Sequence, residues 1–162
     1  MSRNCICNIP GGTIVVTELE GVEVRCLKAQ RIGRDYVHYY LVPLDPPPAD
    51  LHSLRLIYAD PDSVLTVVRD AAIEIAPAEP VEPGLSELAA PGSNHGVEVG
   101  DVFANQTGHF LKVFDTAKTE RYHAYVDLAS GLIRPRQERN VTGVFRWRLA
   151  THSDEATGDY MS

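Results

Sequence analysis

The sequence is poor in the features that mark specialised protein classes. Its 162 residues include three cysteines, one tryptophan and two methionines. No run of apolar residues is long enough for a membrane-spanning helix, and no signal-peptide segment follows Met1. An odd, small number of cysteines also argues against a disulfide framework. We therefore expect free thiols, a cytoplasmic location and no membrane partner.

Positive charge is scarce as well. Lysine and arginine total 15 against 22 aspartate and glutamate, which gives a formal net charge of -7. Such a chain repels nucleic acid and anionic membranes by default. The sequence also contains no Gly-x-Ser-x-Gly elbow, no glycine-rich phosphate loop and no His-Glu-x-x-His motif. No catalytic residue is assigned, and the sequence gives no positive reason to propose an enzyme.

The cysteines raise the question of a metal site. Structural zinc sites use four ligands, usually in pairs two to four residues apart. Here Cys5 and Cys7 are separated by one residue, and the third cysteine is alone. Cys26 alternates with Val22 and Val24, which predicts a core position. We therefore expect no metal and no cofactor.

The dominant pattern is a series of short β segments separated by turn residues, which predicts an all-β protein. The segments alternate in polarity or are rich in β-branched and aromatic residues. They cover residues 13–19, 22–29, 36–44, 54–58, 64–69 and 72–75, and then 99–104, 110–114, 121–128 and 143–150.

Residues 76–97 interrupt this pattern. They contain four prolines, several acidic residues and no aromatic residue, a composition typical of a linker. The segment predicts an N-terminal lobe at 1–75, a C-terminal lobe at 98–152 and a flexible tail at 153–162. Each lobe is expected to be a small, partly open SH3-like barrel, or the two together a two-lobed β-sandwich. The lobes resemble each other faintly, through duplication or through chance.

Arginine is concentrated in residues 134–148, with Glu138 as the one acidic residue among them. Strand alternation places Trp147 in the core with Phe145 and Leu149, and the intervening arginines outside. An arginine face of this kind binds an acidic protein surface or a second copy of the chain, binds nucleic acid by phosphate pairing and stacking, or is simply solvated. The candidate binding residues are Arg134, Arg136, Arg139, Arg146 and Arg148.

A second candidate is a pocket between the lobes. His123, Tyr125 and Asp127 alternate along one segment, so they are expected to share a face, as an acid–base site or a solvated surface. The aromatic segment at 36–44 is expected to line the other side of this pocket. The candidate pocket residues are Tyr36, His38, Tyr40, His123, Tyr125 and Asp127.

The leading functional prediction is a non-catalytic protein-binding or assembly protein, able to associate with itself or with another protein. Two alternatives stay open. One is a nucleic-acid-binding module that uses the arginines of residues 134–148, although the acidic net charge makes nucleic acid the less expected partner. The other is an enzyme or small-ligand binder with a pocket between the lobes.

Overall fold

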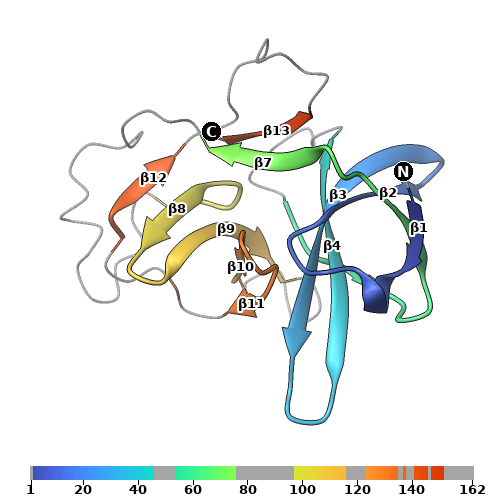
Figure 1. Cartoon of the computed structure of the whole chain (residues 1–162). Coiled ribbons are helices and arrows are strands. Elements are labelled where there is room, and N and C mark those ends of the chain that lie inside the picture. The colour runs from blue at the N-terminus through green and yellow to red at the C-terminus, as the bar shows by residue number, and fades with distance from the viewer. Residues whose placement is uncertain are drawn as a thin grey trace.

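The computed structural model is built from antiparallel sheets, so the all-β prediction is confirmed (Figure 1). It describes residues 2–45, 54–75, 97–115, 123–134, 137, 141–145 and 147–151. Within these ranges the strands are accompanied by one short 3-10 turn, η1 (Ile6–Asn8). No described helix is long and apolar enough to cross a membrane.

The largest sheet has six strands, all from the first half of the chain. Its two longest strands, of eleven and nine residues, form the hairpin β3–β4. Figure 1 shows this hairpin extending beyond the body of the fold. The strand order is β1 (Ser2–Cys5), β6 (Val64–Val67), β2 (Ile14–Leu19), β3 (Val22–Ile32), β4 (Val37–Asp45) and β5 (Ile57–Ala59).

The second sheet has five strands, all from the second half of the chain. Their order is β11 (Ile133–Arg134), β10 (His123–Asp127), β9 (Gly108–Phe114), β8 (Val102–Asn105) and β12 (Gly143–Phe145).

A third sheet pairs the two halves of the chain. It consists of β7 (Ala71–Ile75) and β13 (Trp147–Thr151), with Trp147 opposite Ile75. Phe145, two residues earlier, pairs with Val102 in the five-stranded sheet. The single strand expected at 143–150 is therefore two strands, because the chain changes sheets between Phe145 and Trp147.

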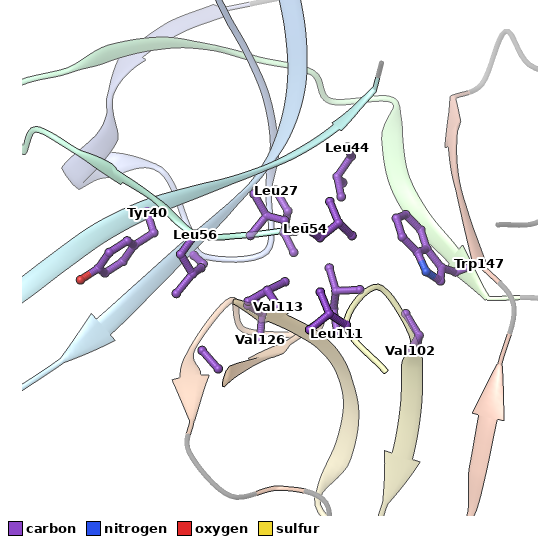
Figure 2. Close-up of a cluster of buried hydrophobic side chains, with 14 of the residues drawn as sticks. Leu27, Tyr40, Leu44, Leu54, Leu56, Val102, Leu111, Val113, Val126 and Trp147 are labelled. Carbon is purple, nitrogen blue, oxygen red and sulfur yellow. The ribbon is translucent and has the colours of Figure 1, made fainter. Parts of the chain in front are cut away.

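One hydrophobic core is shared by residues that precede and follow 76–97. Figure 2 shows Leu27, Leu44 and Leu54 from the first half in one cluster with Val113 and Trp147 from the second. Trp147 is fully buried, as predicted, and its indole N–H donates to the Gly100 carbonyl at 2.8 Å.

Each of the two large sheets also covers a smaller core on its other face. Cys26, predicted to be a core residue, is fully buried there beside Ile6 and Val15. Phe103, Phe110 and Tyr125 belong to the corresponding cluster of the five-stranded sheet. Strand alternation produces this arrangement, since neighbouring residues of one strand enter different cores.

The two halves are also joined by backbone hydrogen bonds. Phe114 donates to the Leu54 carbonyl at 2.8 Å, and Leu56 donates to the Phe114 carbonyl at 3.0 Å. Farther along the junction, Gln30 donates to the Gly131 carbonyl at 2.9 Å. This junction attaches the segment before β5, and β3 at a point near the hairpin turn, to the second half of the chain.

The finer fold prediction goes beyond these findings. None of the three described sheets closes into a barrel, and their strand orders differ, so the SH3-like and two-lobed descriptions stay predictions. The expected linker at 76–97 lies outside the described residues except for Val97, which is buried. The expected tail at 153–162 lies outside them entirely.

Candidate functional site

The outer part of the β3–β4 hairpin carries a row of aromatic side chains. Strand pairing sets Tyr40 opposite Tyr58 of β5, and His38 opposite Arg31 of β3. Because side chains alternate, His38 and Tyr40 lie on the same face of β4 as Val42, which is in the shared core. We call the four rings Tyr36, His38, Tyr40 and Tyr58 the tyrosine surface.

The four rings contact one another in sequence. The centroids of Tyr36 and His38 are 4.4 Å apart, and those of His38 and Tyr58 are 5.9 Å apart in an edge-to-face arrangement. Tyr58 and Tyr40 are also edge-to-face, at 5.8 Å. Tyr36 is 48% exposed and Tyr58 55% exposed, whereas Tyr40 is buried. The row of rings therefore runs from a buried tyrosine to two tyrosines that are about half exposed.

A tight turn holds the outermost ring. The Gly33 backbone N–H donates to the Tyr36 carbonyl at 2.9 Å, which closes the end of the hairpin. A Cβ added to Gly33 would lie only 2.1 Å from the Tyr36 ring. The Tyr36 ring thus packs against the bare backbone of Gly33, and any larger residue at that position would displace it.

An ion pair supports the innermost ring. Arg31 donates to the Asp115 carboxylate at 2.7 Å, and its guanidinium carbon lies 5.5 Å from the centre of the Tyr40 ring. Arg31 also donates to the Tyr40 hydroxyl at 3.4 Å. Burial raises the pKa of Tyr40, and Arg31 partly offsets that effect. The Tyr40 hydroxyl therefore stays neutral and able to donate a hydrogen bond.

Apolar side chains are exposed on the opposite face of the hairpin end. Ile32 is 60% exposed and pairs in register with Val37, which is 39% exposed. The end of the hairpin therefore exposes apolar or aromatic side chains on both faces, with Arg34 and Asp35 exposed in the turn between the strands.

Of the expected pocket residues, the structure brings three together and separates the other three. Tyr36, His38 and Tyr40 lie in the tyrosine surface. Tyr125 is buried in a different core, edge-to-face with Phe103 at 5.7 Å. Asp127 accepts a hydrogen bond from the Ala129 backbone at 2.9 Å and so organises a turn. The expectation that Tyr125 lies on a solvated or open face is therefore wrong, because a second core covers that side of β10.

His123 is exposed at the start of β10. Its ring contacts Phe114 with 5.3 Å between centroids. Partial burial lowers the pKa of His123, and the positive charge of Lys112 lowers it further. The imidazole is therefore more weakly basic than a free histidine.

Tyr58 belongs to the surface but is absent from the residues predicted from sequence. The sequence could have indicated Tyr58, because pairing the segments at 36–44 and 54–58 as neighbouring antiparallel strands brings two tyrosines together. One depression of the described surface, with a volume of about 350 Å³, contains none of the predicted pocket residues. It is lined by Arg69, Asp70, Ala71, Ala72, Ile73, Glu74 and Ala150.

The arginine-rich segment does not present the expected face. Arg134 is exposed at the end of β11. Arg148 is only 8% exposed and pairs with Glu74 of β7 at 3.4 Å. The expectation that Arg148 points into solvent is wrong, because its side chain is buried and pairs with Glu74, which stands opposite it in register on β7. Arg136, Arg139 and Arg146 lie outside the residues whose side chains are described.

Comparison with known protein families, curated proteins and solved structures found no match for this chain. The described residues also contain no cluster of three metal-ligating side chains. The tyrosine surface is therefore the best-defined candidate site, on the strength of its geometry and exposure.

Proposed function

We propose that this protein is a non-catalytic binding module that holds another protein on the tyrosine surface. The observation that carries the proposal is the half-exposed pair Tyr36 and Tyr58, linked through His38 to a buried third tyrosine. Tyrosine is enriched at protein interfaces, where its ring supplies apolar area and its hydroxyl a hydrogen bond.

The surface is arranged so that binding costs little conformational freedom. Tyr40 is fixed by burial and by Arg31, and Tyr36 is fixed against Gly33. Rings already held in their bound positions lose less entropy when a partner arrives. This preorganisation favours a recognition role over a merely solvated surface.

The chemistry of the surface defines the partner. Arg31 is already paired with Asp115, so the tyrosine surface offers rings, hydroxyls and an imidazole with little unbalanced charge. The matching partner is a protein segment with apolar or aromatic side chains and hydrogen-bond acceptors. Its affinity should depend only weakly on salt, unlike that of an acidic partner held by arginines. A cytoplasmic location belongs to the same proposal.

The test compares three tagged full-length baits in the lysate of the native cell. The first is the wild type and the second is Tyr36→Ser/Tyr58→Ser. The third is a matched control, Val22→Ser/Val64→Ser, which removes two equally exposed apolar side chains elsewhere. Val22 lies at the opposite end of β3 from the tyrosine surface.

The expected result is a protein retained by the wild type and by the control, and reduced about tenfold or more on the tyrosine variant. An untagged copy of the chain in the same lysate reports whether the retained protein is a second copy. If all three baits retain the same proteins in equal amounts, the tyrosine surface is not the contact and the proposal fails.

A further inference from the structure

The two N-terminal cysteines lie in direct contact. Cys5 ends β1 and Cys7 lies within η1, and their Sγ atoms are 2.8 Å apart. The extended backbone of Cys5 followed by the 3-10 turn brings the two side chains to the same side of the chain. Cys7 is exposed and Cys5 half-buried, so reagents in solution can reach the pair.

The separation favours a disulfide over a shared metal ion. A disulfide bond is about 2.05 Å long, so the two sulfurs need approach by only about 0.8 Å. Two thiolates on one tetrahedral zinc ion, each about 2.3 Å from it, lie about 3.8 Å apart, so these sulfurs would have to separate. Within the described residues no third metal-ligating side chain joins them.

The surroundings of the pair are polar. Cys5 Sγ donates to the Pro61 carbonyl at 3.2 Å, and Ile6 donates its backbone N–H to the Ser63 carbonyl at 2.8 Å. The Lys28 ammonium donates to the Ile9 carbonyl just beyond η1. The pair is thus held in place by the neighbouring turn while its outer sulfur stays accessible.

We propose that Cys5 and Cys7 form a thiol–disulfide exchange site, which an external disulfide of the glutathione class converts into an intramolecular disulfide. The Cys7 thiolate attacks one sulfur of oxidised glutathione and expels one glutathione thiolate. The Cys5 thiolate then attacks the Cys7 sulfur of the mixed disulfide and expels the second. Two electrons pass from the cysteines to glutathione, and the two protons released by the cysteines are taken up by the two glutathione thiolates.

Cys26 supplies an internal reference. It is fully buried, and burial raises its pKa to about 12. The hydrogen bond with Cys5 raises the pKa of Cys7 as well. What separates Cys26 from the pair is burial, because a reagent in solution reaches Cys7 and does not reach Cys26. The folded chain should therefore react at Cys5 and Cys7 and leave Cys26 reduced.

The test uses the reduced full-length chain, incubated with excess oxidised glutathione, then quenched with an alkylating reagent and digested with trypsin. Cleavage after Arg3, Arg25 and Lys28 places Cys5 and Cys7 together in one peptide and Cys26 in the next. Mass spectrometry should find the first peptide short of two hydrogens and the Cys26 peptide alkylated.

Variants separate the two steps. In Cys5→Ala the second attack is impossible, so Cys7 should keep one glutathione, whereas Cys26→Ala should form the same disulfide as the wild type. Persistent glutathione on the wild-type peptide, or disulfide-linked dimers, would overturn the proposal. So would unreacted thiols in the wild type. The wild-type result stands without any variant, and it is independent of the tyrosine surface.

Discussion

Arg31 and Asp115 form an ion pair across the junction between the two halves of the chain. The atoms Nη2 and Oδ2 are 2.7 Å apart, and the Asp115 side chain is only 3% exposed. The pair connects the β3–β4 hairpin to the end of β9. Because Arg31 also donates to the Tyr40 hydroxyl, the same contact positions the inner end of the tyrosine surface.

Replacing Arg31 by methionine should destabilise the protein by about 2–3 kcal/mol. The variant removes the cationic partner of a buried carboxylate, and breaking a buried pair costs more than losing a surface one. The 23% exposure of the Arg31 side chain lets water offset part of the penalty. Denaturant unfolding measures the change.

The double variant Arg31→Met/Asp115→Leu isolates the interaction. It removes both charges together, so it should be more stable than the sum of the single losses implies. The single variants Arg31→Met and Asp115→Leu complete the comparison. If their losses of stability simply add up to the loss in the double variant, the ion pair contributes nothing across the junction.

Trp147 should be a stability determinant of the shared core. Trp147→Ala removes a fully buried ring and should lower the free energy of unfolding by about 3–5 kcal/mol. Trp147→Phe keeps much of the packing but loses the hydrogen bond to Gly100, at a cost of about 1–3 kcal/mol. Unfolding should be followed by circular dichroism, because Trp147 is the one tryptophan and both variants lose its fluorescence. A negligible loss in Trp147→Phe would argue against the hydrogen bond, and equal losses in the two variants would argue against the packing contribution.

His123 should make the fold less stable in mild acid. Its pKa is lowered in the folded state by partial burial and by Lys112, so the unfolded chain binds the proton more readily. Between the folded pKa and 6.5, stability therefore rises with pH and falls on acidification. Unfolding measured from pH 7.5 down to 5.5 should show a small loss that is absent in His123→Gln. A histidine titration by NMR with a pKa at or above 6.5 would contradict this.

Gly131 should tolerate no side chain. Its φ is +71°, and a Cβ would lie 2.3 Å from the Gly12 nitrogen and 2.6 Å from the Gly11 backbone. Gly131→Ala should cost at least about 2 kcal/mol, because backbone overlap adds to the left-handed conformation. Gly21→Ala is the matched control, since Gly21 has φ +80° with nothing within 4 Å of the added atom. Equal thermal melting of the two variants would mean that the junction adapts.

The sequence by itself determined the class of structure and the position of several core residues. Alternating segments predicted most of the described strands, although not β1 or β11, because a strand with one buried face must place apolar residues at every second position. The same pattern placed Trp147 and Cys26 in cores, where the structure has them. The candidate site could be predicted in part, since Tyr36, His38 and Tyr40 stand in one recognisable aromatic segment.

Tertiary structure alone decided which segments became neighbours. Alternation along β10 cannot show that a second core covers Tyr125, and alternation along β13 cannot show that Arg148 faces Glu74. Tyr58 joins the tyrosine surface only through its pairing with Tyr40, and Asp115 reaches Arg31 from a strand 84 residues away in sequence. An alternating pattern shows which side chains share a face of a strand. It does not show what covers that face, because the neighbours are set by strand order and sheet packing.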